Sequence, residues 1–313
     1  MMSVVSVTHL GFVVKNHFWS KSTPILRDVH FDVQPREILG FIGPNGAGKT
    51  TCIKTLLGLL RPTSGQVFLF GQSPQKPQAR EAVGFMPERA YYAGHLSARE
   101  LLLQHALLAG LSWQRATKQS VELLERVGLA QAGNKPLRNF SKGMLQRAGI
   151  GQALVGDPQL LILDEPMSGL DPIGRHDLRE LLLQLKRDGK TIIFSSHILS
   201  DVEALCDRLT VVVQGRTAMS GKLSELLTSK VQSVTVVAEN LSVESLTKLT
   251  SWGVSRPLDQ QFTWTCANHV ESNALMDQVR SLGGTIVELQ TQHRSLEEIF
   301  MHAASAQQGD KHA

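Results

Sequence analysis

A glycine-rich segment, GPNGAGKTT at residues 43–51, has the residue types and spacing of a phosphate-binding loop. Its glycines would let the backbone curl around phosphate, with N–H groups pointing inward beside the positive end of a following helix. The cradle would consist of Gly43, Pro44, Asn45, Gly46, Ala47 and Gly48. Lys49 would reach the β- and γ-phosphates, the Thr50 hydroxyl would bind Mg²⁺, and Thr51 would support the cradle. The segment therefore predicts a phosphate site that also holds magnesium.

Two adjacent carboxylates, Asp164 and Glu165, follow an apolar strand predicted in LLILDEP at residues 160–166. Asp164 stands at the end of the strand, where it would hold the Mg²⁺ shell, and Glu165 would polarise an attacking water as general base. Such a pair alone is more often a solvated turn, but a complete phosphate loop in the same chain reverses that balance. The pair therefore predicts hydrolysis at the phosphate site.

His197 ends a second apolar strand, TIIFSSH at residues 191–197. A lone histidine at such a place is more often an ordinary loop residue than a catalytic one. If this strand lies beside LLILD, however, its end brings His197 within hydrogen-bonding reach of the γ-phosphate.

These side chains need a sheet to bring them together, and the pattern of the chain predicts one. Both apolar strands lack a polar face, as strands of a covered parallel sheet should. Short β-rich runs alternate with helical stretches over the first two thirds, but residues 97–156 carry leucines at helical spacing and almost no strand signal. The sequence predicts an α/β core domain over residues 1–228 with a mostly helical subdomain inserted at about 90–156.

A second change of pattern after about residue 230 predicts a small α+β domain over residues 229–305, followed by a disordered tail at 306–313. The segments VQSVTVVAEN, QQFTWTCA and TIVELQTQ have strand patterns, and two helical patterns separate them. SLEEIFMHAA opens with the capping-box pattern Ser295-x-x-Glu298. Nothing in this region carries a chemical motif.

Composition excludes several classes of function. A net charge of +4 over 313 residues is mild, so no nucleic-acid partner is expected. The three cysteines are scattered without metal-binding spacing, which indicates a reducing compartment. The richest apolar run, LLLQHALLAGL, is shorter than the roughly 18 apolar residues of a membrane span. We expect no membrane-crossing helix in this chain.

Two further motifs complete a family pattern. FSKGM at residues 140–144 matches the signature turn usually written LSGGQ, and MSGLDP at 167–172 matches the adjoining D-loop. With the phosphate loop, the carboxylates and the histidine in family order, residues 4–225 resemble the nucleotide-binding domain of ABC ATPases. The resemblance implies a P-loop NTPase of the ABC type that binds ATP with Mg²⁺ and hydrolyses it. It also implies that Ser141 and Gly143 bind the γ-phosphate of ATP held by a second ATPase domain, with Asp171 contacting across the same interface.

The chain departs from the family pattern at several positions. Lys142 and Met144 replace the usual glycine and glutamine of the signature turn, and Glu88 replaces a glutamine that senses Mg²⁺ and the membrane subunit. Glu88 can still accept a hydrogen bond from a metal-bound water. Phe18 is the predicted stacking partner of adenine, although both it and Trp19 could be ordinary packing residues.

The resemblance implies the ATP-hydrolysing motor subunit of an ABC transporter, at the cytoplasmic face of the inner membrane. It would form a homodimer, or a heterodimer with a similar ATPase, and dock onto an integral-membrane permease through a groove lined by Tyr91, Tyr92 and Leu96. The combination of MPE, FSKGM and SLEEIF resembles that of ATPase subunits of bacterial exporters whose membrane subunit is a separate chain. The alternatives are an importer ATPase, a soluble ABC protein acting on ribosomes or DNA, and a non-hydrolytic sensing module.

Overall fold

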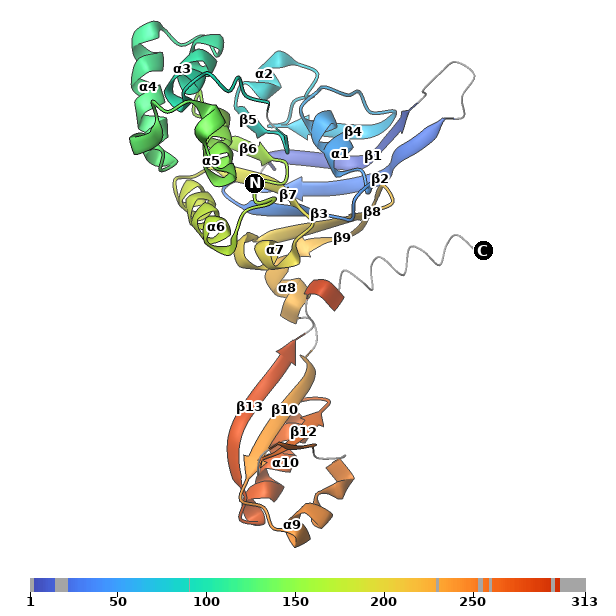
Figure 1. The fold of residues 1–313 in the computed structure, drawn as a ribbon. Helices are drawn as coiled ribbons and strands as arrows, with labels where there is room; N and C mark the ends of the chain where they lie inside the picture. The colour runs from blue at the N-terminus through green and yellow to red at the C-terminus, as the bar shows by residue number, and fades with distance from the viewer. Residues whose placement is uncertain are drawn as a thin grey trace. The chain divides into compact units, whose positions relative to one another are not determined.

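The computed structural model describes residues 3–14, 22–89, 91–228, 231–252, 256–258, 261–293 and 296–298 (Figure 1). The chain divides between Leu223 and Ser224 into two compact units, each of which is treated separately below. None of the described helices is long and apolar enough to span a bilayer.

A nine-stranded sheet in the order β4-β1-β2-β9-β8-β3-β7-β6-β5 forms the first unit. Its parallel part contains β3 (Ile38–Ile42), β5 (Val83–Met86), β6 (Leu160–Leu163), β7 (Thr191–Ser196) and β8 (Arg208–Val213). Its antiparallel part contains β1 (Val5–Val14), β2 (Thr23–Val33) and β4 (Ser64–Leu69), and β9 (Arg216–Lys222) joins the two parts. Every residue of β3, β6 and β7 is buried, as the unbroken apolar runs predicted.

The strand pairing decides where the site can form. β7 lies between β3 and β6 and runs parallel to both, with Ile42 opposite Ser196 and Leu163 opposite Phe194. The carboxyl ends of all three strands therefore meet at one edge of the sheet. The phosphate loop follows β3, the two carboxylates follow β6, and His197 follows β7. Segments more than a hundred residues apart are brought together in this way.

Four helices follow strands of the core or lie beside it, namely α1 (Lys49–Leu56), α2 (Pro77–Arg80), α6 (Pro172–Arg187) and α7 (Leu199–Leu205). One face of α1 is buried at Ile53 and Leu56, which join a core cluster that also includes Leu39 and Phe41. This packing fixes the start of α1, and with it the loop that precedes the helix.

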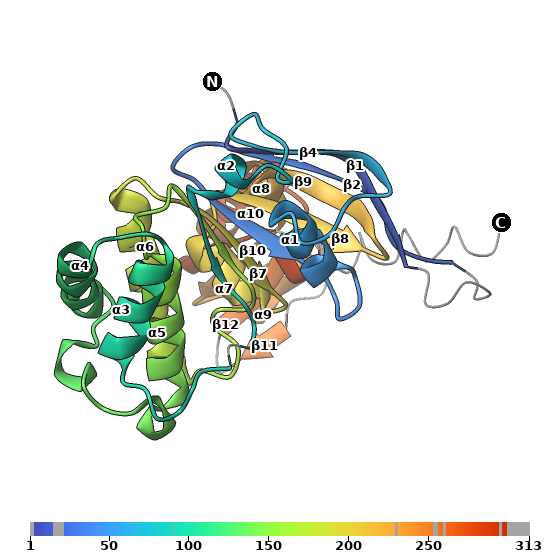
Figure 2. The same ribbon diagram turned by 90° about the horizontal axis from the view of Figure 1, so that it is seen from above.

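The helical insertion consists of α3 (Ala98–Leu108), α4 (Trp113–Arg126), α5 (Lys142–Ala153) and two short 3-10 turns at Ala130–Ala132 and Leu137–Asn139. Seen from above, the three helices gather at the end of the sheet away from β1, β2 and β4 (Figure 2). A capping box starts α3, because the Ser97 hydroxyl accepts from the Glu100 N–H at 3.2 Å and Glu100 accepts from the Ser97 N–H at 2.7 Å. This agrees with the predicted helical subdomain.

The second unit is an α+β fold, also as predicted. Its sheet has the order β11-β12-β10-β13, and its strands are β10 (Val231–Glu239), β11 (Arg256–Leu258), β12 (Gln261–Cys266) and β13 (Thr285–His293). Two helices accompany it, α9 (Val243–Lys248) and α10 (His269–Ser281), while α8 (Leu223–Thr228) precedes it. Val236 and Trp264 of the sheet pack with Leu275 and Val279 of α10 in one core. The sequence analysis missed β11, and the predicted cap residue Ser295 lies outside the described residues.

Candidate functional site

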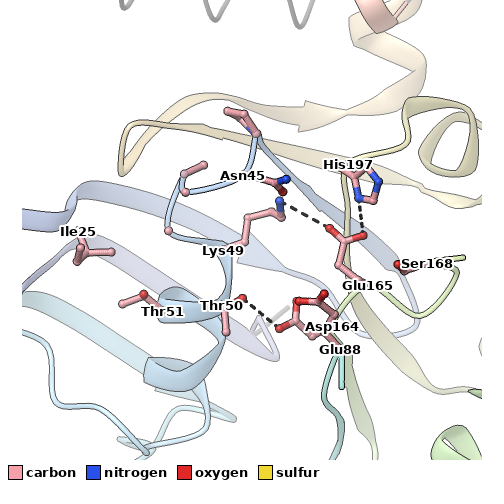
Figure 3. A pocket seen from close by; sticks show the side chains of 14 residues that line it. Ile25, Asn45, Lys49, Thr50, Thr51, Glu88, Asp164, Glu165, Ser168 and His197 are labelled. Atoms are coloured by element: carbon pink, nitrogen blue, oxygen red, sulfur yellow. Dashed lines mark hydrogen bonds and ion pairs between the residues drawn. The ribbon is translucent and has the colours of Figure 1, made fainter. Parts of the chain in front are cut away.

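The predicted phosphate loop lines a pocket at the carboxyl edge of the sheet (Figure 3). The lining consists of Ile25, residues 44–51, Glu88, Asp164, Glu165, Ser168 and His197. The loop needs glycine at position 48, because its φ is 102° and a Cβ there would lie 2.5 Å from Leu26 Cδ2. Gly43 lies below the pocket, where its carbonyl accepts from Lys49 Nζ at 2.6 Å. The loop thus has the tight curl that phosphate cradles require.

Lys49 is held at the floor of this pocket with its side chain 8% exposed. Besides the Gly43 carbonyl, its ammonium has the Glu165 Oε1 atom at 3.7 Å. A cation with two oxygen partners in a buried site is already oriented, so little side-chain entropy remains to be lost on binding an anion.

Asp164 is tied to both neighbouring segments. The Thr50 hydroxyl lies 3.2 Å from Asp164 Oδ2, and the Ser195 hydroxyl donates to Asp164 Oδ1 at 2.6 Å. Burial raises the pKa of Asp164 above its ordinary value, the two hydroxyl hydrogen bonds oppose that rise, and the negative charges of Glu165 and Glu88 add to it. The site therefore concentrates negative charge that a bound cation would neutralise.

Glu165 points toward His197 rather than toward Asp164. Its Oε2 atom lies 2.8 Å from His197 Nδ1, and its backbone N–H donates to the Ser195 hydroxyl at 2.8 Å. The φ of Glu165 is 51°, in the left-handed region that non-glycine residues seldom adopt. Such conformations persist where surrounding contacts impose them, and the Ser195 hydrogen bond is one such contact. The turn separates two adjacent carboxylates into two positions.

The oxygens of this pocket fit Mg²⁺ better than a metal held by protein alone. Among the described residues, no group of three or more histidine, cysteine, aspartate or glutamate side chains could hold a metal ion. Mg²⁺ usually takes only one or two protein oxygens and completes its octahedron with water and phosphate. Thr50 and Asp164 offer such a pair, and Glu88 lies on the same wall with its side chain 48% exposed.

The predicted signature residues lie in a different place. Ser141, Gly143 and Asp171 line a second pocket together with Lys142 and Arg147, and none of the three is in the described lining of the phosphate pocket. In this chain Ser141 caps α5, accepting from the Met144 N–H at 3.3 Å. Asp171 caps α6, accepting from the Gly174 N–H at 2.7 Å. One chain therefore carries both motif sets, but it does not bring them together.

The other predicted binding residues are Phe18, for adenine, and the two tyrosines of the permease groove. Phe18 lies outside the described residues, so the adenine contact stays a prediction. Tyr91 is 92% exposed, whereas Tyr92 packs near Met86 and Gly149, and burial raises its pKa to about 12. Both tyrosines line a groove with Glu88 and Lys142, whereas Leu96, which was also predicted there, is not in the described lining of this groove.

Sequence reasoning missed three residues of the phosphate pocket and its support, Ile25, Ser168 and Ser195. Ser195 could have been found, because it is a polar residue inside a strand that is apolar on both faces. Ile25 and Ser168 carry no such signal.

Comparison with known proteins agrees with this geometry. A family model described as "ABC transporter" matches residues 26–168. An uncharacterized ABC transporter ATP-binding protein of Nostoc sp. is 39% identical over 313 residues, covering 99% of this chain and 92% of that protein. The linearmycin resistance ATP-binding protein of Bacillus subtilis is 31% identical over 290 residues, covering 89% of this chain and 93% of that protein. The Nod factor export ATP-binding protein of Cupriavidus metallidurans is 39% identical over 209 residues, covering 66% and 69%.

Solved structures show the same fold. The structure of an ATP-binding subunit of an ABC transporter aligns with a TM-score of 0.62 at 31% identity, over 72% of this chain and 93% of that one. A dimeric, post-hydrolysis ATP-binding cassette bound to ADP and Pi aligns with a TM-score of 0.63 at 22% identity, over 70% and 98%. Both support the predicted P-loop NTPase core.

Proposed function

The chain belongs to the ABC transporter ATP-binding proteins, which are ATPases, and we propose that it is the motor subunit of an exporter with a separate membrane permease. Two similar proteins are named for Nod factor export and for linearmycin resistance. Because export and import use the same ATPase chemistry, the direction rests on these relatives rather than on the site.

The observation that carries the proposed chemistry is one hydrogen-bonded chain. It runs from Thr50 through Asp164 and Ser195 to the Glu165 backbone, and from the Glu165 side chain to His197. In this proposal Asp164 and Thr50 hold Mg²⁺, with Glu88 contacting a metal-bound water. Magnesium, when bound, would neutralise charge on the phosphate oxygens.

Glu165 would act as the general base. Its Oε2 atom lies 2.8 Å from His197 Nδ1, so the carboxylate is held at a defined position beside the phosphate loop. It would take a proton from the attacking water, while His197 holds the carboxylate and contacts the γ-phosphate. Lys49 and the loop N–H groups would bind the phosphates.

We propose that two copies, or this chain and a similar ATPase, complete each site. Ser141, Gly143 and Asp171 lie outside the phosphate pocket of their own chain, and the similar cassette solved with ADP and Pi is a dimer. The exposed amino end of α5 would then receive the γ-phosphate held by the partner's loop.

The permease would dock in the groove lined by Glu88, Tyr91, Tyr92 and Leu145. Such docking would place the chain at the cytoplasmic face of the membrane. No nucleic-acid partner is proposed, because the net charge of +4 is mild for 313 residues.

Direction of transport can be tested in cells that carry either the wild-type chain or its Glu165→Gln variant. An exporter predicts that the variant raises accumulation of, and sensitivity to, at least one compound of a panel of amphipathic antibiotics and lipids. Reduced uptake of a nutrient in the variant, with unchanged sensitivity to the panel, would identify an importer instead.

A further inference from the structure

A buried carboxylate near the site has an oxygen without a partner. Asp201, the third residue of α7, is 2% exposed, and its Oδ2 atom has no hydrogen-bond partner within the described parts of the chain. An unpaired buried carboxylate is costly, and native structures keep few of them. A capping role at the start of α7 would give this oxygen a backbone N–H, which it lacks. Asp201 therefore needs another explanation.

Two arginines of α6 act on this carboxylate through their positive charge. Arg175 and Arg179 stand one turn apart on that helix, which packs beside α7, and both are half-buried. Burial raises the pKa of Asp201, while Arg175, Arg179 and His197 lower it and Glu165 raises it further. In the part of the chain that the structure describes, neither guanidinium lies within 4.0 Å of the carboxylate. The three groups therefore form a cluster of opposite charges without a direct ion pair among the described residues.

Asp201 and Arg175 are connected to different parts of the proposed site. Asp201 lies four residues after His197, which contacts the Glu165 side chain. Arg175 Nε donates to the Leu170 carbonyl at 3.2 Å, next to Asp171. Asp171 begins α6 and, in the proposed dimer, would face the second copy.

Resting on the proposed function, we propose that Asp201 is a positioning residue of the ATPase reaction. Its carboxylate would pair with Arg175 when the nucleotide site closes, and so connect the segment that carries His197 to the Leu170–Asp171 turn. Arg175 is assigned as the partner because its Nε atom donates a hydrogen bond to the Leu170 carbonyl of that turn. When the nucleotide site of one copy closes, this pairing would fix the position of the Leu170–Asp171 turn, which would face the other copy.

The unpaired oxygen of Asp201 predicts how the stability of the protein should change when the charge is removed. In the nucleotide-free chain the Oδ2 atom of Asp201 is buried without a hydrogen-bond partner within the described residues, so replacing the carboxylate by an amide should leave this protein as stable or more stable. A purely structural carboxylate would behave in the opposite way, because its removal would lower stability. Loss of turnover without loss of stability therefore separates positioning from structural support.

The test uses the full-length chain with Asp201→Asn, measuring kcat, KM for ATP, ATP affinity and the thermal unfolding midpoint. We expect kcat to fall roughly tenfold, as coupling of about this size between sites predicts, with ATP affinity changed less than twofold and an equal or higher midpoint. Glu180→Gln is the matched control, because it is an exposed carboxylate of α6 and should change none of these quantities.

Arg175→Gln and the double variant complete a cycle. If Asp201 and Arg175 act as a pair, Arg175→Gln lowers kcat similarly and the double variant is no slower than either single variant. Wild-type kcat in Asp201→Asn, a lowered unfolding midpoint, or multiplying losses in the double variant would each overturn the proposal. Failure of the site assignment itself would appear separately, as wild-type turnover in Glu165→Gln.

Discussion

The two halves of the proposed catalytic site are built in different ways. In the phosphate-loop half, side chains at or just after the carboxyl ends of three strands contact one another, as in the contacts Thr50–Asp164, Ser195–Asp164 and His197–Glu165. In the signature half, the hydrogen bonds of the Ser141 and Asp171 side chains within the described residues go to backbone N–H groups three residues further along their own helices. The first half depends on the tertiary fold, whereas the second is assembled locally.

This difference indicates what each half can do alone. Lys49, Asp164 and Glu165 are buried and mutually oriented within one chain, so nucleotide binding and the preparation of the base need no partner. Ser141 is exposed, and its hydroxyl is engaged only in a 3.3 Å cap. A cap of this kind can be exchanged for a phosphate oxygen at small cost. The signature half is therefore suited to a ligand that a second copy brings.

The largest effect should come from breaking the phosphate-loop half at its base. Glu165→Gln keeps the shape of the side chain but removes the proton acceptor, so kcat should fall roughly 10²- to 10⁴-fold while ATP binding remains. Steady-state ATPase assays and a nucleotide titration measure the two quantities. Glu180→Gln is the matched control, because it makes the same change at an exposed position of α6 that is not in the lining of the pocket; its kcat should equal that of wild type. Equal losses in both variants would contradict the assignment of Glu165.

The second prediction separates the two halves by placing one defect in each. Lys49→Ala should lose ATP binding, because its ammonium is the cation at the floor of the pocket. Ser141→Arg should bind ATP but not hydrolyse it, because the bulk of arginine fills the exposed end of α5. Mixing the two proteins gives heterodimers in which one composite site holds both defects and the other is intact. ATPase activity should therefore partly return.

Two measurements decide this experiment. Differently tagged variants show by co-purification that heterodimers form, and mixing each variant with itself gives the baseline. Full activity of Ser141→Arg alone would contradict a signature half that acts in trans.

How much of the site could be predicted follows from the same contrast. Loop residues 43–51 stand in consecutive positions, so their geometry could be inferred from spacing alone, and the cap at Asp171 follows from an aspartate before Pro172. The support of Asp164 by Ser195 depends on how β6 pairs with β7, and nothing local to either strand encodes it. The left-handed turn at Glu165 was likewise not predicted, because a Leu-Asp-Glu-Pro segment does not demand it. The α/β class was predictable from the pattern of apolar runs, whereas the full order of strands in the sheet and the short β11 were not.

A smaller effect concerns the free energy of unfolding, which the burial of Asp164 in the phosphate-loop half should lower at neutral pH. The pKa of Asp164 is raised in the folded chain, so its contribution to stability is greatest below its ordinary pKa near 3.8 and is lost as pH rises through the raised value. At neutral pH, Asp164→Asn should therefore raise the thermal unfolding midpoint of the nucleotide-free protein by roughly 1–4 °C. Unfolding midpoints of both proteins between pH 4 and pH 8 should converge at the acidic end. A lower midpoint for Asp164→Asn at neutral pH would show that its hydrogen bonds outweigh the cost of its burial.

The smallest effect on the isolated chain is expected at the groove proposed for the permease, which extends the comparison to two neighbouring side chains. Tyr91 is 92% exposed, whereas the ring of Tyr92 packs near Gly149 of α5 and Met86 of β5. Tyr91 thus resembles the signature half in presenting a group to a partner, and Tyr92 resembles the buried half in supporting the fold. Tyr91→Ser should leave the unfolding midpoint and basal ATPase activity unchanged, because no packed contact is lost, and should weaken co-purification with the permease.

Tyr92→Ser is the matched variant, and it should lower the unfolding midpoint by several degrees because a half-buried aromatic ring that lies near α5 and β5 is removed. The pair separates docking from packing, which a simultaneous change of both tyrosines could not do. Normal retention of the permease by Tyr91→Ser would place the docking surface elsewhere. A lowered midpoint in Tyr91→Ser would instead show that this exposed ring supports the fold, and the contrast between the two tyrosines would fail.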